Sequence, residues 1–458
     1  MMRTFDAIII GAGQAGPSLA GRLTAAGRTV ALIERKLVGG TCVNTGCMPT
    51  KAMVASAYTA HLARRGAEYG VVTGDVSVDF ARVMARKDKV RFDARKANED
   101  WLAGMKGLTF IRGHARFESP KIIRVGEERL SAGQIFLNVG GRAVVPDFPG
   151  VGEVPHLDNV SMMELDRLPA HLVIVGGSYV GLEFAQMFRR FGSRVTVVEK
   201  GPRLISREDE DVSDAVRDIL EREGIAIRTG AECIRFVRSG KDVGVGVDCA
   251  EGAPEIIGSH ILLATGRRPN TDDLGLDTAG VATDKRGYVI VDDRLETNVP
   301  GIFAMGDCNG RGAFTHTAYN DFEIVAANLL DSEPRKVSER IQTYALYIDP
   351  PLGRAGMSET EARGTGRRLL VGTRPMTRVG RAKEKGETLG FMKVIADAGT
   401  GEILGASILG TGGDEAVQSI LDVMYAGRPY TTITHAMHIH PTVSELIPTV
   451  FGEMRPAD

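Results

Sequence analysis

The chain has 458 residues, of which 43% are hydrophobic and 25% are charged, as in an ordinary soluble globular protein. Its 56 lysines and arginines nearly balance its 58 aspartates and glutamates, so charge gives no reason to expect nucleic acid or a membrane surface as a partner. No apolar run approaches the roughly 18 residues that a membrane helix needs, and the N-terminus shows no signal-peptide pattern.

The first 35 residues are predicted to form a strand, a glycine-rich turn, a helix and a second strand. Apolar runs at residues 7–10 and 30–33 indicate two buried parallel strands, and Glu34 ends the second. The turn between them fits the pattern GxGxxG through Gly11, Gly13 and Gly16. Such a turn lets the backbone approach a pyrophosphate, which the N-terminus of the following helix binds. Because Glu34 is placed to accept hydrogen bonds from a ribose, the segment predicts a dinucleotide site.

The cysteine pair follows in GGTCVNTGCMPTK, at Cys42 and Cys47, in a chain with only five cysteines. A cytoplasmic location is expected without an export signal, and there a close pair is more typical of catalysis or metal binding than of a structural disulfide. We expect the pair at the start of a helix running through Tyr58, whose dipole would favour a thiolate. The alternative interpretations are a zinc site, which would need two more close ligands, and two inert buried thiols. The other three cysteines are scattered and are interpreted as small buried residues: Cys233, Cys249 and Cys308.

The fingerprint returns at residues 172–200, so the chain is predicted to have two dinucleotide sites. Its turn keeps the outer glycines and replaces the middle one, through Gly176, Ser178 and Gly181. Glu199 would accept from a free ribose 2′-hydroxyl and repel a 2′-phosphate, which favours NADH over NADPH. Lys200 and Arg203 would moderate that preference, although we interpret them as ordinary solvated charges. Two dinucleotide sites and one cysteine pair together indicate a relay from nicotinamide through flavin to a disulfide.

The segments around the second fingerprint are rich in predicted strands. Residues 107–145 look β-rich, and TGRRPN at 265–270 reads as a loop after a buried strand. A short apolar strand at 302–305 ends at Asp307, before a segment with helical apolar spacing. A carboxylate at that place suits the hydroxyls of a bound cofactor chain, and a plain turn is the alternative interpretation.

The pattern changes from about residue 339. No glycine-rich phosphate loop follows, and strands alternate with a helix in a separate α+β domain. The predicted strands and helix are at 344–348, 391–396, 403–409 and 414–426.

GGTCVNTGCMPTK resembles the redox-disulfide motif of the flavoprotein disulfide reductases of the glutathione reductase type. The resemblance spans nearly the whole chain, through both fingerprints, the cysteine motif, TGRRPN, the MGD segment and the C-terminal HPTVSE. It implies an α/β fold with FAD at the first fingerprint, NADH at the second with NADPH as the alternative, and a homodimer. The implied domains are an FAD-binding domain (1–148 and 269–338), an NAD(P)H-binding domain (149–268) and a C-terminal α+β dimerisation domain (339–458).

The resemblance also implies roles for individual residues. Cys47 would face the flavin as a charge-transfer thiolate, and Cys42 would be the interchange thiol that meets the substrate. Lys51 would lie near the flavin and pair with Glu183, and Tyr179 would cover the nicotinamide pocket. The remaining implied cofactor-binding residues, beyond the fingerprints, are Thr41, Ala115, Gly266 and Asp307.

An acid–base pair is implied near the C-terminus. His440 of one subunit would move protons at the interchange thiol of the other, and Glu445, five residues on, would orient it. Such a base must titrate near neutral pH and be held in one tautomer by a carboxylate. Metal binding is the alternative interpretation for the cluster of His435, His438 and His440.

Several substrates fit these patterns. The first hypothesis is an NAD(P)H:disulfide oxidoreductase acting on a small disulfide or dithiol. The second is dihydrolipoamide dehydrogenase within a 2-oxo acid dehydrogenase complex, although CVNTGCMPTK and HTAYND depart from that enzyme's usual motifs. The third is a metal-ion reductase like mercuric reductase, although no cysteine pair follows Cys308 to handle mercury. A redox sensor is the fourth, and only the cysteine pair itself supports it.

Overall fold

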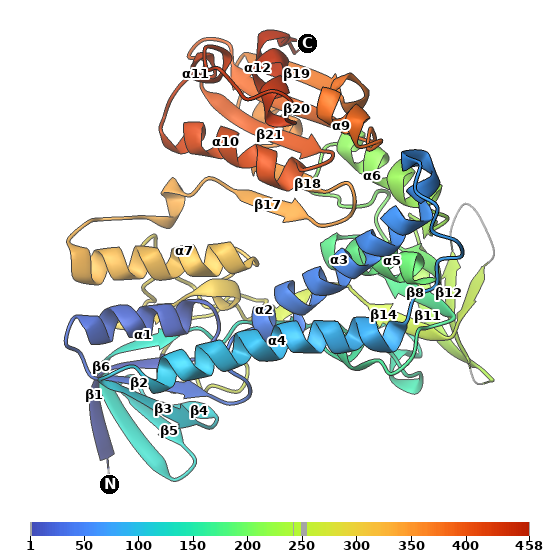
Figure 1. The fold of residues 1–458 in the computed structure, drawn as a ribbon. Coiled ribbons are helices and arrows are strands. Elements are labelled where there is room, and N and C mark those ends of the chain that lie inside the picture. Colours follow the sequence, from blue (N-terminus) through green and yellow to red (C-terminus); the bar gives the residue numbers. More distant parts are fainter. Residues whose placement is uncertain (1, 241, 249–253, 458) are drawn as a thin grey trace.

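The computed structural model describes residues 2–240, 242–248 and 254–457, without the side chain of Cys233 (Figure 1). Cys249 lies outside the described residues, whereas Cys308 is fully buried, as predicted. Three main sheets divide the chain, and the domain boundaries given above remain a prediction. None of the described helices is both long enough and apolar enough to span a bilayer.

The first sheet is built mainly by the N-terminal part of the chain. Its order is β3-β2-β1-β6-β5-β4, and β16 pairs with β6 from much later in the sequence. The strands β3, β2, β1, β6 and β16 run parallel, as expected for buried apolar runs bordered by helices. These strands are β1 (Met2–Ile10), β2 (Val30–Glu34), β3 (Leu108–Arg112), β4 (Ala115–Ser119), β5 (Ile122–Val125), β6 (Glu128–Leu137) and β16 (Ile302–Ala304).

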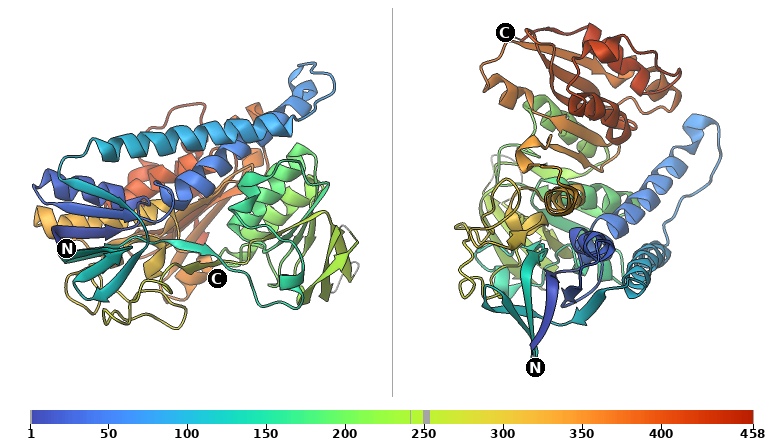
Figure 2. Two further views of the ribbon diagram at one scale, coloured as in Figure 1. Left: turned by 90° about the horizontal axis from the view of Figure 1, so that it is seen from below. Right: turned by 90° about the vertical axis from the view of Figure 1, so that its left-hand side faces the viewer.

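Three helices accompany this sheet. Helix α1 lies beside α7, and the long α4 runs next to them, as the two views of Figure 2 show. Their bounds are α1 (Ala15–Ala25), α4 (Phe80–Ala103) and α7 (Thr315–Ala326). The sequence patterns predicted a helix after the first fingerprint and another after the MGD segment, and α1 and α7 confirm those two predictions.

The second sheet repeats the parallel design, in the order β10-β9-β8-β14. A three-stranded antiparallel sheet, β11-β12-β13, adjoins it. The strands are β8 (His171–Val175), β9 (Arg194–Val198), β10 (Ala226–Arg228), β11 (Glu232–Ser239), β12 (Asp242–Asp248), β13 (Glu255–Gly258) and β14 (His260–Leu263). The helices are α5 (Tyr179–Phe191) and α6 (Glu210–Arg222). The two fingerprints therefore fold alike.

The C-terminal sheet is wholly antiparallel, in the order β17-β18-β21-β20-β19-β22. Its strands are β17 (Thr343–Leu346), β18 (Leu352–Gly356), β19 (Leu369–Pro375), β20 (Phe391–Asp397), β21 (Ile403–Leu409) and β22 (Arg455–Pro456). Its helices are α8 (Glu359–Arg363), α9 (Gly380–Glu384), α10 (Gly413–Tyr425), α11 (Thr431–Thr434) and α12 (Ile447–Gly452). The predicted α+β character of this part is confirmed.

Two sequence predictions about local structure were wrong. The cysteines do not share one helix: Cys42 lies in α2 (Gly40–Thr45) and Cys47 begins α3 (Cys47–Arg64). Gly46 separates the helices because its backbone, at φ −136° and ψ −119°, is not helical. TGRRPN is not only a loop, since β15 (Arg267–Pro269) pairs with β7 (Gly141–Ala143) from far away in the sequence.

Candidate active site

The first glycine turn is shaped by close backbone contacts. Gly11 has φ +109°, and a Cβ there would lie 2.2 Å from the carbonyl oxygen of Asn138. A Cβ on Gly16 would lie 2.2 Å from the carbonyl oxygen of Gly11, so the helix packs directly on the turn. Glu34 accepts a 2.9 Å hydrogen bond from the backbone N–H of Ala12, inside the same turn. Only glycine permits this close approach of turn, strand and helix.

The second turn has the same geometry. Gly176 has φ +118°, and its Cβ would lie 2.4 Å from the carbonyl oxygen of Ala264. A Cβ on Gly181 would lie 2.1 Å from the carbonyl oxygen of Gly176. Glu199 accepts a 2.6 Å hydrogen bond from the N–H of Gly177. The weaker sequence match, with serine at the middle position, thus still forms the same turn.

Both turns present a helix N-terminus with unused donors. Among the described residues, no side chain caps α1 or α5, and neither helix has an acidic residue in its first turn. Gly13 and Ser178 occupy the middle place of the two turns. In this arrangement the first backbone N–H groups of each helix can donate hydrogen bonds to a ligand, and a phosphate is a suitable acceptor. The donor set therefore fits the pyrophosphates of FAD and of a nicotinamide coenzyme.

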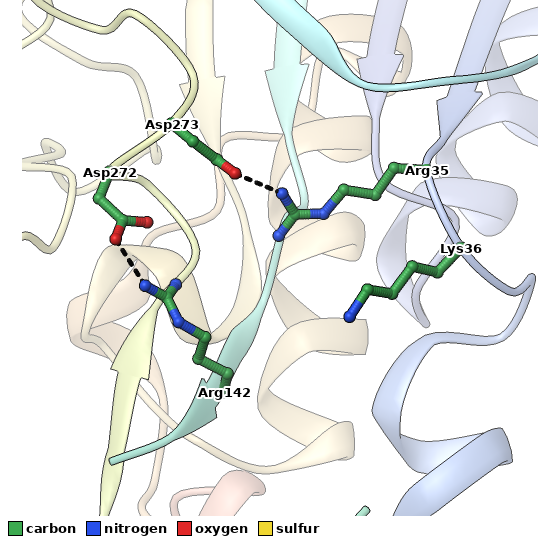
Figure 3. Close-up of a pocket in the computed structure, with 5 residues that line it drawn as sticks. All are labelled: Arg35, Lys36, Arg142, Asp272 and Asp273. Carbon is green, nitrogen blue, oxygen red and sulfur yellow. Dashed lines mark hydrogen bonds and ion pairs between the residues drawn. The ribbon is translucent and has the colours of Figure 1, made fainter. Parts of the chain in front are cut away.

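A cavity of about 420 Å³ opens at the carboxyl end of β2 (Figure 3). Two of its lining residues, Arg35 and Lys36, come directly after Glu34. The lining also holds two ion pairs: Arg35 with Asp273 at 2.6 Å, and Arg142 with Asp272 at 2.5 Å. One carboxylate oxygen of Asp273 is buried without a partner among the described residues. A polar cavity beside Glu34, the predicted ribose acceptor, suits the adenosine end of a dinucleotide.

The remaining predicted cofactor residues lie around these turns. Asp307 follows β16, and its carboxylate lies 3.4 Å from Nε of Arg267 in β15. Gly266 has φ +117° with open space where a Cβ would point. Thr41 lies in α2, and buried Ala115 begins β4. The sequence pattern TGRRPN did not single out Arg267, because its partner Asp307 is far away in the sequence.

The two cysteines of the predicted redox pair are free thiols at the junction of α2 and α3. Sγ of Cys47 lies 3.0 Å from Oγ1 of Thr315, the first residue of α7. Thr315 is therefore a site residue that sequence reasoning missed, because 268 residues separate it from Cys47.

The thiols of the pair differ in acidity. A hydrogen bond from Cys42 lowers the pKa of Cys47 to about 6, and the hydroxyl of Thr315 and the charge of Lys51 contribute to the lowering. The same hydrogen bond, with burial, raises the pKa of Cys42. These opposite directions favour the negative charge of the pair on Cys47 near neutral pH.

Lys51 is fixed one turn after Cys47 on α3. Its Nζ lies 2.7 Å from a carboxylate oxygen of Glu183 in α5, and Glu183 is buried. The backbone N–H of Tyr347 donates a 3.1 Å hydrogen bond to the other carboxylate oxygen of Glu183. The centroid of the Tyr347 ring also lies 4.4 Å from Nζ of Lys51. Residues four apart share a helix face, so the ammonium group is held on the side of the Cys47 thiolate.

An aromatic cluster surrounds Tyr179, at the start of α5. Its ring meets Tyr344 edge-on at 5.3 Å and Phe314 edge-on at 6.1 Å. Tyr344 donates a 2.6 Å hydrogen bond to buried Glu208, which in turn lies 3.3 Å from Nη1 of buried Arg354. Sequence reasoning missed these neighbours because they come from three distant segments.

His440 and Glu445 form a pair at the other end of the chain from the cysteines. Nδ1 of His440 lies 2.8 Å from a carboxylate oxygen of Glu445, and the His440 side chain is 79% exposed. Within the described part of the chain, neither Cys42 nor Cys47 is hydrogen-bonded to His440. The same part holds no group of three or more His, Cys, Asp or Glu arranged for a metal ion.

Two family models cover most of this architecture. Residues 5–321 match the model described as pyridine nucleotide-disulphide oxidoreductase, and residues 343–451 match its dimerisation domain. The chain belongs to the pyridine nucleotide-disulphide oxidoreductase family. It is a flavoprotein of the class that uses FAD and NAD(P)H in disulfide reduction, and its dimerisation domain supports a homodimer.

Individual relatives lie in several branches of the family. The chain is 36% identical to the probable pyridine nucleotide-disulfide oxidoreductase RclA of Escherichia coli (strain K12), over 98% of this chain and 99% of the relative. It is 32% identical to a mercuric reductase of Streptomyces lividans (97% and 94%) and 33% identical to a dihydrolipoyl dehydrogenase of Thermus scotoductus (97% and 96%). A solved structure described as the Cu(II) complex of the HOCl-induced flavoprotein disulfide reductase RclA from Escherichia coli superposes with a TM-score of 0.90, at 36% identity, over 98% of this chain and 99% of that one.

Proposed function

We propose that the protein carries electrons from a nicotinamide coenzyme, NADH in preference, through FAD to the Cys42–Cys47 pair and on to a small disulfide. The observation that carries this proposal is the unequal pair of thiols. Cys47 holds a thiolate at neutral pH beside Lys51 and Thr315, whereas Cys42 keeps its proton. One sulfur is thus prepared to sit against a flavin and the other to be activated at the moment of attack.

The chemistry at sulfur follows from this inequality. The chemistry that bound FAD would supply is two-electron transfer between the coenzyme and the Cys42–Cys47 disulfide. The thiolate of Cys42 then attacks one sulfur of the substrate R–S–S–R, the S–S bond breaks, and RS⁻ leaves and takes a proton. Cys47 attacks Sγ of Cys42, re-forms the Cys42–Cys47 disulfide and releases the second RS⁻, which is also protonated. The balance is NADH + H⁺ + RSSR → NAD⁺ + 2 RSH.

A base must remove the proton of Cys42, because the charge on Cys47 holds it there. We assign this role to His440 of the partner subunit, with Glu445 keeping Nδ1 protonated and Nε2 free to accept. The exposure of His440 in one chain supports this arrangement, because an exposed imidazole is available to a second subunit. The homodimer would then be the catalytic unit.

The cofactor assignments rest on the backbone N–H donors of the two glycine turns and on the open space beside them. The turn at Gly11, with Glu34, Thr41, Ala115 and Asp307, would hold FAD. The turn at Gly176, with Glu199 and Tyr179, would hold the coenzyme, with its ribose hydroxyls at Glu199. The open backbone at Gly266 lies near Arg267 and Asp307 and would border the flavin chain. A cytoplasmic location fits a protein that works through free thiols, since thiols persist in reducing compartments.

A second candidate substrate is Cu(II). One solved relative is described as a Cu(II) complex of RclA, and thiolates are ligands that favour Cu(I). The Cys47 thiolate and the Cys42 thiol would reduce two Cu(II) to two Cu(I), with formation of the Cys42–Cys47 disulfide and release of the one proton held by Cys42. Copper would be a substrate here, since the described residues offer no further ligands grouped around the pair.

The test is anaerobic turnover of the FAD-loaded protein with NADH and a panel of acceptors: lipoamide, glutathione disulfide, 4,4′-dithiodipyridine and Cu(II). We expect at least one disulfide to be reduced by the wild type and to be left intact by Cys42→Ser. Turnover of Cu(II) alone would favour the second candidate, and fast turnover of lipoamide would place the chain with the dihydrolipoyl dehydrogenases. Disulfide turnover that survives Cys42→Ser would overturn the proposal.

A further inference from the structure

The segment HTAYND, residues 316–321, departs from the motif usual in dihydrolipoamide dehydrogenase, and it has no part in the cysteine chemistry proposed above. It lies in the first half of α7, and its last residue, Asp321, is buried, with 2% of its side chain exposed. A buried carboxylate loses its hydration and needs partners inside the protein. The partners of Asp321 therefore indicate what this charge does.

One carboxylate oxygen of Asp321 supports the short helical turn that contains Asp307. Oδ2 accepts a 2.7 Å hydrogen bond from the backbone N–H of Gly306 and a 2.8 Å hydrogen bond from Nδ2 of Asn309. The same Nδ2 donates a 3.0 Å hydrogen bond to the carbonyl oxygen of Ala304, the last residue of β16. The carboxylate of Asp321 is therefore bonded to both ends of the turn, at Gly306 and at Asn309.

The other carboxylate oxygen of Asp321 binds an arginine from the connection to the C-terminal sheet. Oδ1 accepts a hydrogen bond from Nη2 of Arg340, and Nε of Arg340 donates a 2.8 Å hydrogen bond to Oδ1 of Asn320. Arg340 lies just before β17, and 10% of its side chain is exposed. Within the described part of the chain, neither Asp321 nor Arg340 has a second ion-pair partner. The two residues therefore form an isolated buried pair.

The charge of Asp321 depends on this pair. Every partner of its carboxylate is a donor, so both oxygens accept, as in the ionised form. Burial raises the pKa of Asp321, and the charge of Arg340 opposes that rise. Loss of Arg340 would leave the carboxylate buried without a counter-charge. The hydrogen bonds from Asp321 to the turn therefore depend on Arg340 as well.

The turn at Gly306 also lies against the first glycine turn. Gly306 has φ +72°, and a Cβ there would lie 3.6 Å from Oδ1 of Asn138. Nδ2 of Asn138 donates a 3.2 Å hydrogen bond to the carbonyl oxygen of Gly11. A shift of the Gly306 backbone would therefore move Asp307 relative to the donors of the first turn. A binding site needs its groups held within about 0.5 Å by supporting hydrogen bonds, and Asp321 supplies such a bond.

We propose that Asp321 and Arg340 are positioning residues for FAD, which act by fixing the turn that carries Asp307. This inference rests on the proposed contact between Asp307 and FAD, and it adds two residues that need not touch the cofactor. Because Arg340 belongs to the connection before β17, the affinity for FAD then depends on the junction with the C-terminal sheet.

Release of FAD tests this without turnover. The FAD-loaded protein is diluted in steps, and the fluorescence of the released FAD gives the Kd. We expect Asp321→Ala to raise the Kd at least 10-fold and Arg340→Met to raise it at least 5-fold. Arg340→Lys, which keeps a positive charge beside Asp321, should raise it at most about 3-fold.

A double-mutant cycle separates positioning from a general loss of stability. Asp307→Ala alone should raise the Kd at least 10-fold. In the Asp307→Ala background, Asp321→Ala should raise it further by at most about 2-fold, because the carboxylate that it positions is gone. Lys393→Met is the matched control, since it breaks a similarly buried pair within the C-terminal part, where Nζ of Lys393 lies 2.6 Å from Glu359. It should leave the Kd within about 2-fold of the wild-type value.

The outcomes are distinct. An unchanged Kd in both Asp321→Ala and Arg340→Met, an equal rise with and without Asp307→Ala, or an equal loss in Lys393→Met would overturn the inference alone. If Asp307→Ala binds FAD like the wild type, the proposed FAD contact of Asp307 fails, and the inference fails with it. If Asp321→Ala does not fold, the same cycle with Arg340→Met decides.

Discussion

At the scale of single residues, the active site depends on how one negative charge is shared between two sulfurs. Cys42 donates a hydrogen bond that lowers the pKa of Cys47, and Thr315 adds a second contact from another part of the chain. Because the pKa of Cys47 is lowered to about 6, its thiolate is present at pH 7 and is lost as the pH falls through 6.

Removal of the Thr315 hydroxyl should weaken this thiolate. In Thr315→Val we expect the pKa of Cys47 to rise by about one unit, because a hydrogen bond to the charged form is lost. The thiolate would then protonate as the pH falls through about 7. The measurement is a pH titration of the long-wavelength absorption that a thiolate beside an oxidised flavin produces in the NADH-reduced protein. Thr317→Val is the control, because the Thr317 hydroxyl forms its hydrogen bonds with the backbone of Phe314, just before α7. The same midpoint in Thr315→Val and wild type would show that this contact does not tune the thiol.

A single carboxylate should also set the choice of coenzyme. Glu199 follows directly after β9. Its carboxylate accepts hydrogen bonds from the backbone N–H groups of Gly177, in the glycine turn, and of Gly201. In Glu199→Ala, the ratio of kcat/KM for NADH over that for NADPH should fall at least 10-fold, since the repulsion of a 2′-phosphate is removed and Lys200 and Arg203 remain nearby. A ratio that stays constant would remove Glu199 from coenzyme selection.

At the scale of elements, β17 links the C-terminal sheet to the unit built on the second glycine turn. Tyr344 of β17 contacts Tyr179 with its ring and Glu208 with its hydroxyl, and Arg354 of β18 completes the buried pair. Burial raises the pKa of Glu208, so its hydrogen bonds matter for keeping the carboxylate inside the protein.

Loss of the Tyr344 hydroxyl should therefore destabilise the fold. Tyr344→Phe is expected to cost about 1–3 kcal/mol, because a buried carboxylate oxygen loses its partner. The effect would appear as a lower urea midpoint of the FAD-loaded protein. Tyr425→Phe, which loses a hydroxyl contact at an exposed site, should shift the midpoint little. Equal midpoints for Tyr344→Phe and wild type would mean that water replaces the hydroxyl.

The sequence alone predicted those helices and strands that have a recognisable local pattern of residues. Apolar runs such as 7–10, glycine turns and helical spacing predicted both dinucleotide units and the C-terminal α+β part. Contacts between distant segments could not be predicted, because no local pattern records them. The pairing of β15 with β7, the contact of Thr315 with Cys47 and the cluster around Tyr179 are of this kind. The break at Gly46 was missed because glycine is also tolerated inside helices.

At the scale of the whole molecule, the proposed mechanism needs two chains. Each chain would supply cysteines to one site and the His440–Glu445 pair to the other, as an isologous dimer allows. His440→Ala should lower disulfide turnover about 100-fold at neutral pH, the usual contribution of general acid–base catalysis. His438→Ala, which removes a neighbouring half-buried histidine whose ring nitrogen contacts a backbone carbonyl, is the matched control.

Mixed dimers test the exchange between chains. When Cys42→Ser and His440→Ala subunits are unfolded and refolded together, about half of the dimers should be hybrids, and each hybrid should hold one intact site. The mixture should then recover about a quarter of the wild-type activity. A mixture as inactive as its two components would mean that His440 serves the cysteines of its own chain or none.

The central claim is that Cys47 faces the flavin and Cys42 faces the substrate. Absorption of the FAD-loaded protein beyond about 500 nm, where a thiolate in contact with oxidised flavin absorbs, tests it directly: the wild type is recorded after anaerobic two-electron reduction by NADH, and the single-cysteine variants, which cannot form the disulfide, are recorded before NADH is added. The proposed roles predict that Cys42→Ser shows the long-wavelength absorption through its remaining Cys47 thiolate, while Cys47→Ser keeps its FAD and shows none. A band that persists in Cys47→Ser and vanishes in Cys42→Ser would reverse the two roles and contradict the account.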